Sequence, residues 1–218
     1  TLTTQSYLDS LSWMPQDVKD VVAIHTLNAG VAPDQTLALY ASMAAVMASD
    51  GVFVPCGGVY EIARGLEALA LHAGVTIRTS EPVVSVRKGL VTTRLDSYTA
   101  DYVVSALDGG ILERLLGKTT PAPKALSCSG VAIFGVLDEE LPDDIVTHSV
   151  MMPDQPATLF DDLGNRDVPS QTMAFLNYYR ANSIYPNDKP VAALLLTAPP
   201  NGMSATLEDD FVQSESRR

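Results

Sequence analysis

The chain has 218 residues, of which 46% are hydrophobic and 18% charged, so it is long enough to bury a core and too apolar to be disordered. Its formal net charge of −12 and the scattering of its Lys and Arg residues make nucleic acid a poor candidate partner. Two cysteines, Cys56 and Cys128, match neither a disulfide framework nor a metal-ligand spacing, and we therefore expect a reducing, cytoplasmic location.

Helices are expected over the first part of the chain. Thr3 or Thr4 is placed to cap a first short helix, and Pro15 stands at the start of a second helix that Gly30 ends. A third helix, with one apolar side, is predicted over residues 36–49. Its apolar run is well short of the roughly 20 residues needed to span a bilayer.

A Pro-Cys-Gly-Gly turn separates a short apolar run from the next predicted helix, residues 58–73, which Gly74 ends. Gly57 and Gly58 have no β-carbon, so a flat ligand can approach their backbone, and a helix that begins there directs free N–H groups toward the ligand. A tight strand-to-helix turn without any ligand is the simpler interpretation of these residues alone.

A β-rich block follows this helix. Residues 75–77 and 82–86 are expected to be strands, residues 88–89 form a turn, and residues 90–95 pair back. The run at residues 100–106 is predicted as a buried strand, and the strands within residues 75–107 are expected to pack against the helix at residues 58–73.

The last part of the chain is predicted as a second group of strands. A short helix at residues 109–116 and a proline-rich linker at residues 119–123 lead into it. The first of its strands is apolar on both faces, which indicates a sheet covered on both sides. The polar tail, residues 201–218, is expected to be frayed. A helix is expected at residues 157–163, and strands at residues 128–137, 148–152, 171–178 and 191–197.

The order of these elements resembles a known family. The run PCGGVYEIARGLEALALHAGVTIRTSEPVVSV, followed after a hairpin by ADYVVSALD, is similar to the middle of the phytoene desaturase and carotenoid isomerase group within the FAD-dependent amine-oxidase superfamily. The later runs SGVAIFGVLD, HSVMMPD and VAALLLTAPP resemble strands of the substrate domain of this group. The resemblance implies a mixed α/β (α+β) fold: a portion of a FAD/NAD(P)-binding flavin domain, plus a substrate domain with a mixed sheet and covering helices.

The resemblance also implies a domain organisation. Residues 1–51 would be substrate-domain helices, residues 52–118 part of the FAD-binding domain, and residues 119–218 the substrate-domain sheet and a C-terminal tail. An enzyme of this group holds the cofactor's pyrophosphate at a G-x-G-x-x-G turn, and no stretch of the sequence has that spacing. We therefore interpret the chain as an internal portion of the enzyme, which by itself is expected to be inactive and to retain no FAD.

Five cofactor-binding residues follow from the resemblance. Gly57 and Gly58 match the turn near the isoalloxazine, and Val83 matches a position whose backbone meets the adenine end of FAD. Ala106 and Leu107 would end a strand beside the cofactor. No catalytic residue is assigned, because in flavin dehydrogenation the redox chemistry belongs to the cofactor.

The substrate implied by the resemblance is a long apolar isoprenoid polyene, which the enzyme desaturates or isomerises. Tyr40, Met43, Met47 and Tyr60 are candidates to line its site, although helical stripes of this kind are more often core residues. Such a substrate is drawn from lipid, so peripheral membrane contact by the whole protein is expected, while the oligomeric state stays open.

Two other functions remain compatible with the sequence. One is an amine- or porphyrinogen-oxidising enzyme of the same superfamily, and the other is a non-catalytic lipid-binding or interaction module. A metal site is not expected, since the acidic pairs of the chain are typical of solvated loops. His25, His72 and His148 are far apart in the sequence and are interpreted as structural or surface residues.

Overall fold

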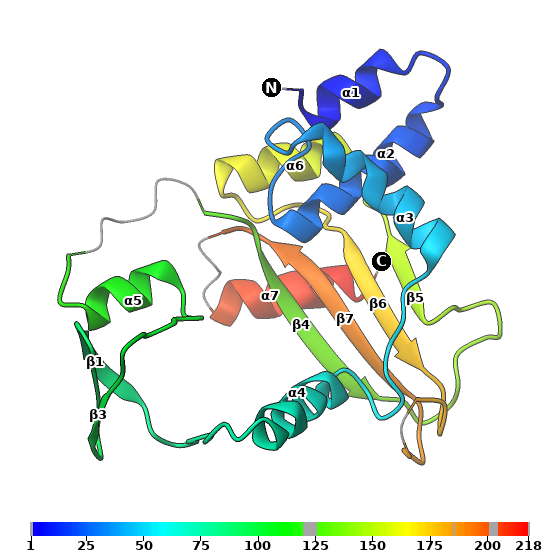
Figure 1. Cartoon of the computed structure of the whole chain (residues 1–218). Helices are drawn as coiled ribbons and strands as arrows, with labels where there is room; N and C mark the ends of the chain where they lie inside the picture. Colours follow the sequence, from blue (N-terminus) through cyan, green and yellow to red (C-terminus); the bar gives the residue numbers. More distant parts are fainter. Residues whose placement is uncertain (1, 120–125, 185, 201–204, 218) are drawn as a thin grey trace. The chain divides into compact units, whose positions relative to one another are not determined.

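The computed structural model describes residues 2–119, 126–184, 186–200 and 205–217. The chain forms two compact units, the first made of Thr1–Glu61 with Leu126–Arg218 and the second of Ile62–Ala125. Helices and antiparallel sheets alternate along the chain, which confirms the expected mixed α/β fold (Figure 1). The prediction that assigns segments to a flavin domain and a substrate domain stays a prediction.

The first unit begins with a helical layer. Thr3 caps its first helix through a reciprocal pair of hydrogen bonds with Ser6, as its position predicts. The second helix begins one residue after the predicted Pro15 and passes into a 3₁₀ turn that Gly30 ends with a left-handed backbone. The elements of this layer are α1 (Thr4–Ser10), α2 (Gln16–Ile24), η1 (His25–Ala29), η2 (Ala38–Ala41) and α3 (Ser42–Asp50).

The predicted third helix is wrong at its beginning. Residues 36 and 37 stay outside the helix because Thr4 binds both of their carbonyls: its N–H donates to Thr36 at 2.9 Å and its hydroxyl to Leu37 at 2.8 Å. The chain therefore enters η2 only at Ala38 and becomes α-helical at Ser42.

A four-stranded sheet forms the centre of the first unit, with strand order β4-β7-β6-β5. All of its pairings are antiparallel, so the expectation of a sheet mixed in strand direction is wrong for the described strands. β4 and β7 share this sheet and lie outside the sheet of the second unit, as predicted. Its strands are β4 (Ser129–Val136), β5 (His148–Met151), β6 (Ala174–Tyr179) and β7 (Val191–Ala198).

One face of the sheet is covered by α7 (Ala205–Glu215), which crosses behind β4 and β7 in Figure 1. Phe211 is only 5% exposed and packs against Ala174 and Leu196 of the strands. The predicted frayed tail is therefore wrong from residue 205 onward, because Phe211, with Val212 beside it, packs the helix on the sheet. Residues 201–204 lie outside the described part of the chain.

The opposite face is covered at one end only. There α2, η1 and α6 (Pro156–Asn165) pack on the sheet through Ile24, Leu27, Leu159 and Phe175. At the other end Phe134 and Val136 of β4 are 81% and 68% exposed. The prediction that this strand is covered on both sides is therefore wrong, since the helical layer does not extend over the whole face.

The second unit contains a small antiparallel sheet of order β1-β2-β3. The turn at residues 88–89 joins its first two strands as predicted, and Gly117 follows its last helix with a left-handed backbone. The linker predicted at residues 119–123 lies, apart from Thr119, outside the described residues. The elements are α4 (Tyr60–His72), which begins at the boundary between the units, β1 (Val83–Arg87), β2 (Leu90–Thr93), β3 (Ser97–Thr99) and α5 (Gly109–Leu115).

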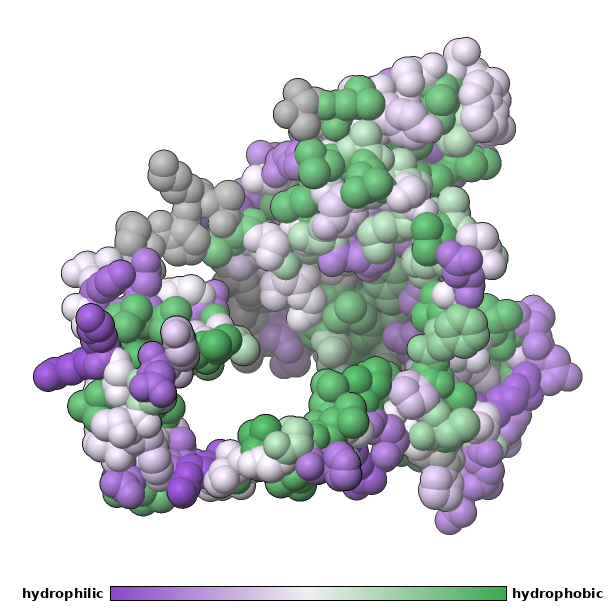
Figure 2. All heavy atoms as spheres, viewed as in Figure 1, coloured by the Kyte–Doolittle hydropathy of each residue, from purple (hydrophilic) through white to green (hydrophobic). Residues whose placement is uncertain are grey.

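Two predicted strands of the second unit do not form. Residues 75–77 and 100–106 belong to no sheet among the described residues, and Tyr102 and Val104 are 91% and 94% exposed. A strand needs a neighbour to bind its N–H and C=O groups, and no described strand lies alongside either segment. The apolar stripe of α4 is exposed as well, so its predicted packing on these strands is wrong (Figure 2).

Within the described residues, every helix is too short or too polar to cross a lipid bilayer.

Candidate functional site

The predicted cofactor residues Gly57 and Gly58 form the expected turn at the start of α4. Both have φ of +93°, and the N–H of Gly58 donates to the carbonyl of Pro55 at 2.9 Å. The N–H of Gly57 donates to the carbonyl of Ile184 at 2.7 Å, so it is already engaged within the first unit. A β-carbon on Gly57 would lie 2.8 Å from Cγ of Glu61, which is a clash. Backbone conformation and this close side chain explain the glycine without a ligand.

Val83 begins the edge strand β1 of the second unit and is half-buried. It pairs with Thr93, and the flanking hydrogen bond runs from the N–H of Arg94 to the carbonyl of Pro82 at 3.3 Å. That pattern makes Val83 and Thr93 a non-hydrogen-bonded pair, in which the N–H and C=O of Val83 point away from β2. Because β1 is an edge strand of its sheet, these groups point to the side on which the described residues place no further strand.

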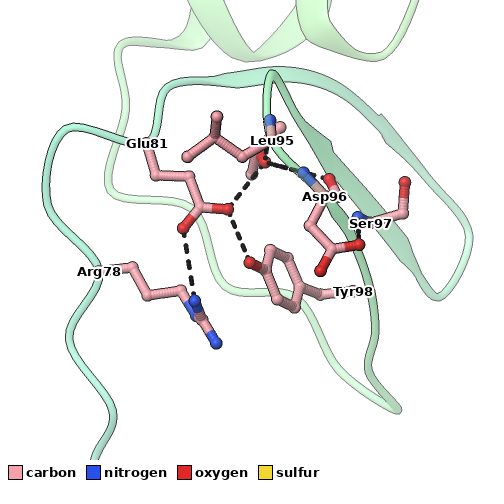
Figure 3. A network of polar contacts seen from close by, with 7 residues as sticks. Arg78, Glu81, Leu95, Asp96, Ser97 and Tyr98 are labelled. Atoms are coloured by element: carbon pink, nitrogen blue, oxygen red, sulfur yellow. Dashed lines mark hydrogen bonds and ion pairs between the residues drawn. The ribbon is translucent and has the colours of Figure 1, made fainter.

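A polar network fixes the segment that leads into Val83. Oε1 of Glu81 accepts hydrogen bonds from the hydroxyls of Tyr98 at 2.6 Å and Thr93 at 2.8 Å, and Arg78 lies 3.6 Å from its other oxygen (Figure 3). The Arg78 guanidinium also stacks 4.7 Å from the centre of the Tyr98 ring. The hydrogen bond from Tyr98, followed by that from Thr93, lowers the pKa of Glu81.

Ala106 and Leu107 do not end a strand. Both are exposed, and the N–H of Leu107 donates to Oγ of Ser105 at 3.2 Å. Of the predicted cofactor residues, Val83 has backbone groups that point away from its strand partner, whereas the N–H of Gly57 is engaged within the first unit. A contact between Val83 and an adenine stays a prediction. Since Gly57 and Val83 lie in different units, the prediction that they hold one cofactor stays a prediction.

The predicted substrate residues fall into two groups. Tyr40, Met43 and Met47 are half-buried along η2 and α3, with the spacing of one helical face. Tyr60 is exposed at the start of α4. Their role in lining a substrate site stays a prediction.

An apolar groove that no sequence pattern predicts lies on the uncovered end of the four-stranded sheet. Its volume is about 350 Å³, and no described residue in its lining carries a charge. Strand pairing places Phe134 beside Ala193 and Val136 beside Val191, with Tyr179 next to Val191 on the following strand. Figure 2 shows apolar surface, in green, over the strands of this face. The groove is lined by Phe134, Gly135, Val136, Tyr179, Val191, Ala192 and Ala193.

Two polar side chains lie on the same face, next to the groove. Asn177 pairs with Ala193 of the groove on one side and with His148 on the other. Nδ1 of His148 is 3.0 Å from Oδ1 of Asn177, and the His148 ring stacks on Phe175 with 5.5 Å between centroids. Because side chains alternate along a strand, the sequence of β6 places Asn177 on the same face as Phe175. The sequence gives no signal for which strand lies beside Asn177.

His25 of η1 is a buried histidine of the same unit. It is 9% exposed, and its Nδ1 has no hydrogen-bond partner among the described residues. Burial lowers the pKa of His25, and the charge of His148 lowers it further. A group of three or more metal-ligating side chains is absent from the described part of the chain.

Comparison with known proteins identifies the family. A family model described as flavin containing amine oxidoreductase matches residues 14–195, which include the glycine turn, the hairpin of Val83 and the groove. The phytoene dehydrogenase of Streptomyces griseus is 31% identical over 140 residues, or 61% of this chain and 27% of that protein. The chain thus spans about a quarter of the length of this curated relative. Because the family match extends over most of its residues, the chain belongs to the flavin containing amine oxidoreductase family.

Proposed function

We propose that the chain is part of a FAD-dependent oxidoreductase that desaturates or isomerises a long apolar polyene. Family membership and the phytoene dehydrogenase relative support a flavin oxidoreductase. When bound, the flavin would supply the redox chemistry, while the protein would orient the substrate and exclude water. In this proposal the backbone of Val83 contacts the adenine, and the first unit contributes the surface that receives the substrate.

The apolar groove on the sheet is the observation that carries the polyene assignment. Its lining is made of aliphatic and aromatic residues with one phenol, and Phe134 and Val136 are exposed although both are apolar. Burying such side chains against a hydrocarbon is worth about 25 cal/mol per Å² of apolar surface removed from water. An amine substrate would instead need a carboxylate or an aromatic cage. None of the described lining residues is charged, and Phe134 and Tyr179, its aromatic residues, lie on strands that β7 separates.

Binding of a fluorescent conjugated hydrocarbon tests this proposal. Diphenylhexatriene, whose emission rises in apolar surroundings, is titrated into the purified chain and into the variant Phe134→Asp. Because Phe134 is 81% exposed, the substitution should leave the fold intact. We expect the aspartate to weaken binding about tenfold or more, since it places a charge where the ligand removes water.

Val146→Asp is the matched control. Val146 is also an exposed apolar residue of the first unit, but it is not part of the groove lining. Its substitution should leave binding unchanged. Equal affinities of Phe134→Asp and Val146→Asp would show that the groove is not the hydrocarbon site and would remove the support for a polyene substrate.

A further inference from the structure

The apolar groove ends against a polar pair, His148 and Asn177. The rows of the antiparallel sheet place Phe134, Ala193, Asn177 and His148 side by side on one face, in that order. The first two line the groove, and the last two are joined by the 3.0 Å contact between Nδ1 of His148 and Oδ1 of Asn177. A ligand that fills the groove therefore meets a polar boundary after one strand spacing, about 5 Å.

This pair has hydrogen-bonding capacity left over. With Nδ1 of His148 donating to Oδ1 of Asn177, the amide N–H₂ of Asn177 keeps two donors and Nε2 of His148 keeps an acceptor lone pair. Neither group takes a partner among the described residues, and both side chains are half-buried.

We propose that His148 and Asn177 bind a hydroxyl group on the ligand, so that the substrate is an oxygenated polyene rather than a pure hydrocarbon. This inference rests on the proposed function, because it takes the groove as the site of the polyene chain. The amide N–H of Asn177 donates to the hydroxyl oxygen, and the hydroxyl donates to Nε2 of His148. The apolar body then lies along Ala193, Phe134 and Val136.

The chemistry of the boundary favours a hydroxyl over a charged group. A carboxylate or phosphate needs a guanidinium or ammonium partner, and neither stands among the described residues of the groove or in the polar pair. An ammonium ion needs a carboxylate, which is likewise absent from these described residues. A hydroxyl both donates and accepts, so it matches one donor and one acceptor held side by side.

The test compares two ligands that differ by one oxygen atom. Retinol, a conjugated polyene alcohol, and its hydrocarbon analogue, in which hydrogen replaces the hydroxyl, are titrated separately into the purified chain by fluorescence. We expect the wild-type chain to bind the alcohol about three- to tenfold more tightly, as one or two net hydrogen bonds imply. Asn177→Leu keeps the size of the side chain and His148→Phe keeps the stacking on Phe175, and either should abolish the preference without weakening the hydrocarbon.

Two controls separate this inference from the proposed function. Ser149→Ala, next to His148 but on the opposite face of the sheet, should keep the preference. Phe134→Asp should weaken both ligands. Equal binding of the two ligands by the wild-type chain, or a preference that survives in both Asn177→Leu and His148→Phe, overturns the hydroxyl site and leaves the groove intact. If neither ligand binds the wild-type chain, the groove is not a polyene site, and both proposals fall.

Discussion

The attachment of α7 to the sheet depends on one aromatic side chain, which makes Phe211→Ala a decisive perturbation. Phe211 is 5% exposed and packs against Ala174 and Leu196, with half-buried Val212 beside it. The remaining described side chains of α7 are exposed, apart from Glu215, which is also buried. If the helix is docked as the structure places it, truncation of Phe211 removes most of the apolar contact that holds it.

The magnitude follows from the buried area. A buried phenylalanine removes about 150 Å² or more from water, which at about 25 cal/mol per Å² amounts to about 4 kcal/mol. Measured Phe→Ala substitutions in cores cost about 3–5 kcal/mol. Because a single helix on one face can settle into the space left behind, we expect the lower end of that range, about 3 kcal/mol.

Urea unfolding followed by circular dichroism measures this cost. With a slope of about 2 kcal/mol per molar urea, a loss of 3 kcal/mol lowers the midpoint by about 1.5 M. Gln213→Ala, two residues along the helix and exposed, should stay within about 0.5 kcal/mol of the wild-type chain. A urea midpoint of Phe211→Ala that is indistinguishable from that of Gln213→Ala would refute the docking of α7 and support the prediction of a frayed tail.

Three further predictions concern the other parts of the chain. The hydrogen bond from Tyr98 lowers the pKa of Glu81 in the folded chain. The ionised Glu81 therefore stabilises the fold above the ordinary pKa of a carboxyl, and this stabilisation is lost as the pH falls through the lowered pKa. An NMR titration should show this acid transition in the second unit and its disappearance in Glu81→Gln. Gly57→Ala should lower the free energy of unfolding by about 1–2 kcal/mol, because φ is +93° and the new methyl group meets Glu61. Gly65→Ala, whose methyl group meets open space within α4, should leave the free energy of unfolding unchanged or raise it by up to about 1 kcal/mol. Urea unfolding measures both. The chain, desalted after incubation with excess FAD, should show no stoichiometric flavin absorption, since it lacks the glycine-rich turn that holds the pyrophosphate.

Local signals in the sequence predicted local structure well. Thr3 caps the first helix, and Gly30 and Gly117 take left-handed backbones where helices end. The hairpin turn at residues 88–89 and the long strands β4 and β7 also lie where they were expected. Each of these features is decided by a few neighbouring residues through capping, backbone conformation or alternation, so one sequence suffices to find it.

The candidate site was not predictable in the same way, because it depends on strand neighbours. Nothing in the sequence pairs Asn177 with Ala193 or His148, since these residues come from three strands separated by long connections. The groove exists because the helical layer covers Phe175 but stops short of Phe134, which is a property of packing and not of any local pattern. Predictions that rested on the family resemblance, such as the role of Val83, remain to be tested.

Two segments whose residues favour strands but that lack a neighbouring strand show the same dependence on packing. Residues 52–54 and 103–104 are rich in β-branched and aromatic side chains, yet they form no strand in the described structure, and all of them except the half-buried Val54 are exposed. β-propensity measures how well a side chain fits a pleated, half-buried surface, and that surface is supplied by neighbouring strands. Each large apolar side chain left in water forgoes about 1.5–3 kcal/mol of burial. The sequence pattern of these segments therefore indicates strands. The free energy that orders a strand comes from pairing and packing with a neighbouring sheet, and the described residues provide no such sheet beside these segments.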